Sequence, residues 1–106
     1  MKAQKIALVT GGSRGLGKNM AISLALKEID VVITYNTNEQ EALNVVAEIE
    51  KLGQKAKAFQ LDAGNIKSFD TFILQVTNYL EEQYGNRNFD FLINNAGTAL
   101  DRKSVV

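Results

Sequence analysis

Two short stretches contain the residue types best suited to chemistry. Residues 10–17 read Thr-Gly-Gly-Ser-Arg-Gly-Leu-Gly and follow an apolar run at residues 6–9. A strand, a glycine-rich turn and a helix in succession form a cradle for phosphate, because glycine allows close backbone approach and a helix N-terminus favours an anion. Residues 94–97, Asn-Asn-Ala-Gly, end a second apolar run. Together these stretches indicate a phosphate-bearing organic ligand.

Composition excludes several other chemistries. The sequence has no cysteine and no histidine, so it offers no thiolate, no disulfide and no histidine base, and we expect no metal site. Twelve basic and twelve acidic residues cancel, which argues against a nucleic-acid partner. No apolar run is long enough for a membrane span and no secretory pattern is visible. We therefore expect a cytoplasmic, single-domain protein that binds an organic cofactor.

Apolar runs and helical periodicities alternate along the chain. We expect strands at residues 6–9, 31–35, 56–61 and 89–93, the first being wholly apolar, as in a buried parallel strand. A helix over about residues 14–28 should present an apolar face of Leu16, Met20, Ala21, Leu24 and Ala25. A second helix should begin at Thr37 or Asn38, with Gln40 or Glu41 completing the cap, and end before Gly53. A third should run from Ile66 to about Tyr84, with Ile66, Phe69, Ile73, Val76 and Leu80 on one face.

This order predicts the fold class. Alternating strands and helices without proline favour an α/β protein with a Rossmann-type, doubly wound parallel sheet. We expect the first four strands of such a sheet, in the order 3-2-1-4. The switch point then falls between strands one and four, where ligands bind across the carboxyl ends of the strands. Both glycine-containing turns are expected at that crevice.

The two motifs together resemble the classical short-chain dehydrogenase/reductase family, over residues from about Lys5 to Leu100. The resemblance implies a partial NAD(P)-binding Rossmann domain at residues 1–100. It implies a tight turn at Gly11, close backbone approach at Gly15 and close helix packing at Gly17. It also implies an oxidoreductase that transfers a hydride between a nicotinamide cofactor and a small carbonyl or alcohol substrate. The turn and the end of the second strand look most like the 3-oxoacyl-carrier-protein reductase branch.

The same resemblance implies a set of cofactor contacts at the ends of four strands. Asp62 would contact the adenine amino group, and the alternative is that it caps the next helix or closes a turn. Asn95 and Ala96 would pass beside the nicotinamide-side ribose, although an asparagine at a strand end also bonds free backbone groups. The full set is Gly11, Ser13, Arg14, Gly15, Leu16, Gly17, Tyr35, Asn36, Asp62, Ala63, Asn95, Ala96 and Gly97.

The cofactor is expected to be NADP rather than NAD. An acidic residue after the second strand would bind the ribose 2′-OH of NAD, but this strand ends in Thr34-Tyr35-Asn36. Arg14 offers a planar cation suited to a 2′-phosphate, and the resemblance associates a basic residue at this position with NADP. The alternative is that Arg14 is an ordinary surface arginine.

The catalytic half of the family pattern has no counterpart in these 106 residues. Family members use a Tyr-x-x-x-Lys pair, a serine and an asparagine. Here Tyr35 precedes Glu39 at that spacing, and Tyr79 and Tyr84 precede Gln83 and Asn88. We therefore assign no catalytic residue and expect the chain alone to be inactive. We also expect it to be only marginally folded, because truncation would leave the fourth strand with an exposed apolar edge. The resemblance places oligomer contacts in later helices, which implies a homo-oligomeric parent.

Two alternatives from other classes stay open. One is a non-catalytic NAD(P)-binding or redox-sensing module. The other is a P-loop nucleotidase, since Gly12, Gly17 and Lys18 satisfy most of G-x-x-x-x-G-K-[ST]. The last position of that pattern is occupied by Asn19, which lacks the hydroxyl that binds Mg²⁺.

The last six residues, 101–106, do not resemble the loop expected after the second motif. The codons GAT CGG AAG AGC GTC GTG, followed by the stop codon TAG, encode them and spell the start of a common sequencing-library adapter. We therefore expect residues 101–106 to be a non-native tail on a truncated reading frame.

Overall fold

Four parallel strands alternate with three helices in the computed structural model, which describes residues 4–12, 15–61, 66–85 and 89–94. The strands are β1 (Ile6–Thr10), β2 (Asp30–Tyr35), β3 (Ala56–Gln60) and β4 (Phe91–Asn94). The helices are α1 (Gly15–Leu26), α2 (Glu39–Lys51) and α3 (Ile66–Tyr84). Every expected element is present. The largest boundary changes are two residues: β4 begins two residues later than expected, and α1 ends two residues earlier.

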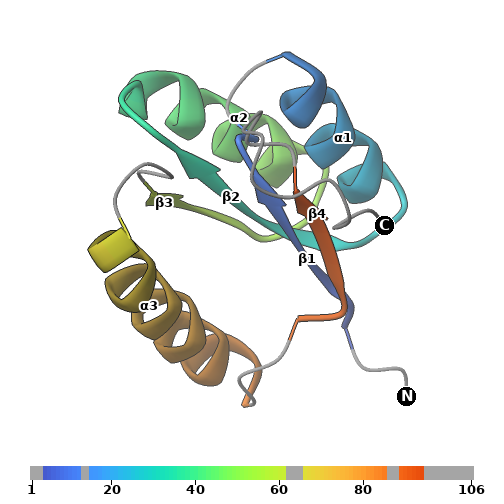
Figure 1. Cartoon of the computed structure of the whole chain (residues 1–106). Helices are drawn as coiled ribbons and strands as arrows, with labels where there is room; N and C mark the ends of the chain where they lie inside the picture. The colour runs from blue at the N-terminus through green and yellow to red at the C-terminus, as the bar shows by residue number, and fades with distance from the viewer. Residues whose placement is uncertain (1–3, 13–14, 62–65, 86–88, 95–106) are drawn as a thin grey trace.

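The sheet order is β3-β2-β1-β4, which confirms the doubly wound arrangement. All three strand pairs are parallel, with Ala7 opposite Val31 on one side and opposite Phe91 on the other. Helices α1 and α2 cover one face of the sheet and α3 covers the other (Figure 1). This change of face occurs where the chain reverses direction across the sheet, between β1 and β4.

Each face of the sheet has its own hydrophobic core. Alternate residues of β1 and β2 point to opposite faces, because strand side chains alternate with a period of two. Val9, Val31 and Ile33 belong to the core under α1 and α2, whereas Leu8 and Val32 belong to the core under α3. The strands β1 and β2 are therefore buried on both faces, as their apolar sequences predict.

Helix α1 packs through its small residues, which confirms the expected burial of Ala21 and Ala25 but corrects that of the larger residues. The buried residues are Gly17, Ala21 and Ala25, spaced four apart along one side. Of the larger residues expected there, Leu16 is 62% exposed, and Met20 and Leu24 are only half-buried. Short side chains allow the helix backbone to lie close to the sheet, so the leucine stripe is displaced toward β4.

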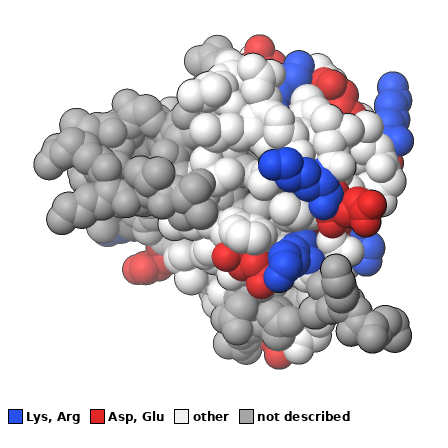
Figure 2. All heavy atoms as spheres, turned by 90° about the vertical axis from the view of Figure 1, so that its right-hand side faces the viewer, with Lys and Arg blue, Asp and Glu red and all other residues white. Residues whose placement is uncertain are grey.

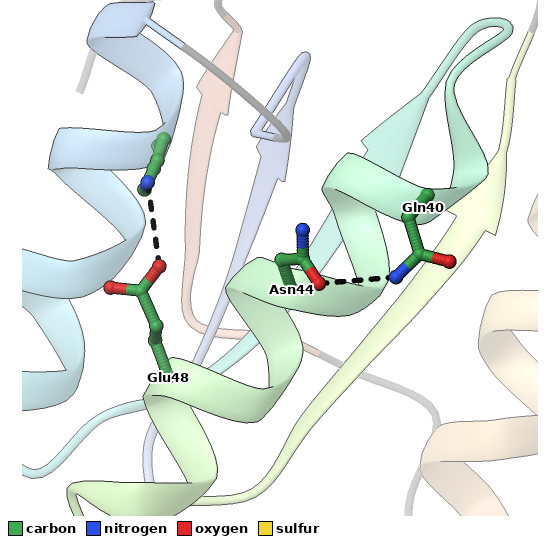
Figure 3. A network of polar contacts seen from close by, with 4 residues as sticks. Gln40, Asn44 and Glu48 are labelled. Carbon is green, nitrogen blue, oxygen red and sulfur yellow. Dashed lines mark hydrogen bonds and ion pairs between the residues drawn. The ribbon is translucent and has the colours of Figure 1, made fainter.

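Helix α2 begins at the cap that its sequence predicts. The Asn38 Oδ1 accepts a hydrogen bond from the Glu41 N–H at 3.1 Å. The helix ends before Gly53, whose φ of 94° is the left-handed conformation usual after a helix. The Glu48 carboxylate meets Lys18 of α1 at 3.4 Å (Figure 3). Both partners are substantially exposed, so this ion pair contributes little stability.

Helix α3 uses a slightly different face from the one expected. Phe72, Val76 and Leu80 are buried against the sheet, whereas Ile73 is 52% exposed. The expected burial of Val76 and Leu80 is confirmed, and that of Ile73 was wrong. Phe72 takes the buried position because its ring meets Phe59 of β3 edge-on, with 6.4 Å between centroids.

A buried carboxylate fastens the end of the sheet that lies away from the glycine-rich turn. Asp30, 4% exposed, begins β2. It accepts hydrogen bonds from the Tyr84 hydroxyl at 2.6 Å, the Gln54 amide at 2.8 Å and the Lys55 N–H at 3.0 Å. These bonds join β2, the approach to β3 and the end of α3. Asp30 therefore has a structural role, consistent with its position at the wrong end of β2 for cofactor binding.

The surface charge is mixed on the side facing the viewer in Figure 2. Lysine side chains lie among aspartate and glutamate side chains beside an uncharged area. Within the described part of the chain, no helix is both long enough and apolar enough to cross a bilayer.

Candidate functional site

The two glycine-containing turns begin at neighbouring points on the same edge of the sheet. Thr10, the last residue of β1, is the register partner of Asn94, the last residue of β4. The Thr10 hydroxyl also lies 3.5 Å from the Ile93 carbonyl oxygen, which accepts from it. The sequence prediction that both motifs lie at the switch point is therefore confirmed at the strand ends from which they start.

The first turn is fixed by the neighbouring strand. Gly11 has a φ of 66°, in the left-handed region that glycine adopts without strain. Its N–H donates to the Thr34 Oγ1 at 2.9 Å, and the Gly12 N–H donates to the Thr34 carbonyl at 3.1 Å. Both N–H groups are thus already hydrogen-bonded within the protein.

Gly12 allows the turn to lie directly on the sheet. A Cβ at this position would be 2.7 Å from the Ile33 Cγ2 and 2.8 Å from the Ile33 Cβ. Ile33 is fully buried and its Cβ is close to the backbone, so it cannot easily move away. Only glycine fits at this position without shifting β2.

The start of α1 has the features of a phosphate site. Gly15, its first residue, has a φ of 63° and is exposed, with no neighbouring atom within 4 Å of where a Cβ would stand. The first turn of α1 contains no acidic residue, whereas α2 places Glu39 and Glu41 in its first turn. A helix N-terminus favours an anion, and no acidic side chain in the first turn of α1 fills that place. Gly17 is buried two positions after Gly15, where close packing was expected.

Leu16 projects from this helix start into an open groove. The groove has a volume of about 370 Å³ and is lined by Leu16, Met20 and Leu24 of α1, Ile93 of β4 and two polar residues. It therefore connects the start of α1 with the end of β4, on the α1 side of the sheet.

Tyr35 and Asn36 lie at the end of β2, next to the end of β3. The Tyr35 carbonyl accepts from the Leu61 N–H at 2.9 Å, and the Asn36 carbonyl accepts from the Gln60 side-chain amide at 3.0 Å. Asn36 is exposed and Tyr35 half-buried. These bonds hold the two strand ends together beside the glycine-rich turn.

A carboxylate does lie near this strand end, although it belongs to α2. Burial of the Tyr35 side chain, together with the charge and hydrogen bonding of Glu39, raises the pKa of the Tyr35 hydroxyl. Glu39 therefore places a negative charge near the Tyr35 hydroxyl.

None of the three tyrosines in the sequence is suited to general acid–base chemistry. Burial, followed by a hydrogen bond to Asp30, raises the pKa of Tyr84, and burial is the main cause that raises the pKa of Tyr79. All three tyrosine pKa values move away from neutrality, and a catalytic pKa should approach it. Among the described residues, no three acidic side chains gather as a metal site would require.

Seven of the predicted contacts fall outside the described residues. They are Ser13, Arg14, Asp62, Ala63, Asn95, Ala96 and Gly97. The six described ones, Gly11, Gly15, Leu16, Gly17, Tyr35 and Asn36, all lie in the turn, in the first turn of α1 or at the end of β2.

Sequence reasoning missed Gly12 and Thr34. The doubled glycine at positions 11 and 12 was the available signal for Gly12, since a tight turn needs only one of them. Thr34 is the single polar residue within the β2 run Val-Val-Ile-Thr-Tyr, and it is 3% exposed. A buried hydroxyl requires a hydrogen-bond partner, which was the available signal for Thr34.

Comparison of the sequence and the fold with known proteins points to one family. A family model described as short chain dehydrogenase matches residues 5–105. The short-chain dehydrogenase/reductase FrzI of a Cladobotryum species is 41% identical over 97 residues, which are 92% of this chain and 35% of FrzI. The chain therefore spans about a third of that relative's length.

Two solved structures share both fold and sequence. The angucycline C-6 ketoreductase LanV with bound NADP is 35% identical with a TM-score of 0.84, covering 89% of this chain and 37% of LanV. A short chain dehydrogenase from Burkholderia cenocepacia J2315, in complex with NADP, is 40% identical with a TM-score of 0.74, covering 92% and 38%. The chain belongs to the short-chain dehydrogenase/reductase family.

Proposed function

We propose that this chain is the cofactor-binding half of an NADP(H)-dependent oxidoreductase that acts on a small carbonyl or alcohol substrate. The observation that carries the proposal is that the two turns start from the same edge of the sheet, where Thr10 of β1 and Asn94 of β4 are register partners. In a doubly wound sheet, this switch point is where a dinucleotide lies. The NADP complexes of two relatives support the choice of cofactor.

The residues of this chain would bind the cofactor through three subsites. The start of α1, with Gly15 and its neighbouring N–H groups, would hold the pyrophosphate. Tyr35 and Asn36, with Asp62 and Ala63, would take the adenosine half. Leu16 and the Asn95–Gly97 stretch would approach the nicotinamide half. When bound, the nicotinamide supplies or accepts the hydride, and this chain positions it.

The preference for NADP depends on a balance of charge. Arg14 adds a positive charge in the turn, and the end of β2 contains no acidic residue. Glu39 opposes this effect, because its carboxylate is near Tyr35. We infer that Arg14 dominates, since its planar guanidinium pairs directly with a 2′-phosphate.

We propose further that the catalytic residues, the substrate pocket and the contacts of a homo-oligomer lie in a part of the natural protein outside this chain. In this view, residues 1–100 are the native Rossmann portion and residues 101–106 a foreign tail, and the protein is cytoplasmic. No tyrosine of this chain is followed by a lysine four residues later, which supports a catalytic tyrosine elsewhere.

A non-catalytic NAD(P)-binding module is the second candidate, since all the features described above serve binding. The P-loop alternative has lost its support. The Gly12 N–H, the first of its phosphate-binding pattern, already donates to Thr34, and the chain belongs to a dehydrogenase family.

Resequencing the native gene across codon 100, followed by an activity assay, tests the proposal. We expect the reading frame to continue past residue 100 and to encode Tyr-x-x-x-Lys. The complete protein should then oxidise NADPH in the presence of a ketone. A genomic stop codon directly after Val106 would contradict the truncation, and a continuous frame without that motif would favour the binding module.

A further inference from the structure

We propose that Thr34 is a positioning residue for the phosphate turn, acting from the adjacent strand through its side-chain oxygen. The inference rests on the proposed function, because it concerns how tightly the pyrophosphate of a dinucleotide is held. It adds to the glycine-rich turn a residue that lies about twenty positions away in sequence and contributes no ligand contact of its own.

The geometry of Thr34 supports this role. Its side chain is 3% exposed, and its Oγ1 accepts from the Gly11 N–H at 2.9 Å. Its carbonyl accepts from the Gly12 N–H at 3.1 Å. One residue of β2 therefore holds two consecutive N–H groups of the turn, one through its side chain and one through its backbone.

These two bonds set the direction in which the chain leaves the sheet. Gly12 is pressed against Ile33, and only two residues separate it from Gly15, where α1 begins. A displacement of the backbone at Gly11 should therefore also move the start of α1. The N–H groups of α1 that face a phosphate keep their positions only while the turn is fixed.

The strand ends proposed to bind the adenosine half are held together by other hydrogen bonds. The carbonyls of Tyr35 and Asn36 accept from Leu61 and Gln60 at the end of β3. Removing the Thr34 hydroxyl leaves both of these bonds intact. Thr34 should consequently affect the pyrophosphate subsite and not the adenosine subsite, which separates positioning from general stability.

The test compares two ligands on the same variants of the whole chain. NADPH contains the pyrophosphate, whereas adenosine 2′-monophosphate contains only adenine, ribose and the 2′-phosphate. Thr34→Val keeps the shape of threonine and removes the acceptor, and Thr34→Ser retains the acceptor. Thr77→Val on α3 is the matched control, because it removes a hydroxyl that bonds the Ile73 and Leu74 carbonyls away from the turn.

We expect Thr34→Val to weaken NADPH binding about tenfold and to leave adenosine 2′-monophosphate binding within about twofold, as measured by calorimetry. Thr34→Ser should restore NADPH binding to within about threefold of the original protein, and Thr77→Val should change neither ligand. If Thr34→Val fails to fold, Thr34→Ala removes the same acceptor and is expected to give the same pattern.

Equal losses for both ligands, or unchanged NADPH binding in Thr34→Val, would overturn the positioning role while leaving the proposed function intact. Failure of the original protein to bind NADPH at all would overturn the proposed function and the positioning role with it.

Discussion

Gly12→Ala tests the packing of the phosphate turn on β2. The added Cβ would meet the Ile33 Cγ2 at 2.7 Å, well short of the 3.4 Å at which ordinary contact begins. The neighbouring Ile33 Cβ, at 2.8 Å, is close to the backbone and moves only with the strand. The substitution therefore forces the turn and the sheet apart.

The expected cost follows from two opposing effects. Overpacking a well-filled site costs about 1–3 kcal/mol. Replacing glycine by alanine stabilises by about 0.5 kcal/mol through the unfolded chain. The net loss in free energy of unfolding is about 1.5 kcal/mol, which corresponds to a fall in Tm of about 6–12 °C for a domain of this size.

Urea unfolding followed by circular dichroism measures this loss. Gly53→Ala is the matched control, because Gly53 also follows an element end but has open space around its Cβ position. With a φ of 94°, that substitution should cost about 1 kcal/mol from backbone strain alone.

A double-mutant cycle with Ile33→Ala identifies the cause. Removing the Ile33 Cγ2 should reduce the cost of Gly12→Ala by about 1 kcal/mol, whereas the cost of Gly53→Ala should not change. Additivity of Gly12→Ala and Ile33→Ala within about 0.5 kcal/mol would refute the packing argument.

Three further predictions concern the charged and polar groups around the sheet. Tyr84→Phe should cost about 1–2 kcal/mol in urea unfolding, because it removes a hydrogen bond to the buried Asp30 carboxylate, and retained stability would contradict that role. Since the folded pKa of Tyr84 is raised, its stabilising contribution is complete below pH 10 and declines above it. Stability should fall less steeply in Tyr84→Phe above pH 10, and an unchanged pH profile would argue against this. Glu39→Gln should increase the NADPH-to-NADH affinity ratio about twofold to fourfold in fluorescence titrations, and a decrease would show that Glu39 does not oppose the 2′-phosphate. Arg14→Ala should weaken NADPH about tenfold and NADH far less, and equal losses would remove Arg14 from the 2′-phosphate site.

The strand order was predictable because the signals for it are local. The apolar runs of β1 and β2 indicate strands buried on both faces, and the helical periodicities between them require crossovers of one hand. The cap at Asn38 and the end at Gly53 depend on residues within one or two turns of helix. Such features need no knowledge of the neighbouring elements.

The buried face of α1 was harder to predict, because two stripes with the same spacing lie side by side. Leu16, Met20 and Leu24 form one, and Gly17, Ala21 and Ala25 form the other. Hydrophobicity favours the first as the core face, yet the second lies against the sheet because small residues permit close approach. The choice depends on the distance between helix and sheet, which periodicity does not contain.

The candidate site, too, was predictable from the sequence only in part. Its position followed from the motifs, since the ends of β1 and β4 are paired as a doubly wound sheet requires. The roles of Gly12 and Thr34 did not follow, because they arise from contacts between the turn and β2. A similar contact brings Glu39 of α2 near Tyr35, although the strand itself ends without an acidic residue.

Equilibrium titration of the purified chain with NADPH, NADH and Mg-ATP, followed by cofactor fluorescence and calorimetry, tests the central claim most directly. A dinucleotide site with Arg14 in its turn predicts saturable NADPH binding, about tenfold weaker NADH binding and no competition by Mg-ATP. Binding of Mg-ATP in place of NADPH, or no binding of NADPH by the folded chain, would contradict it.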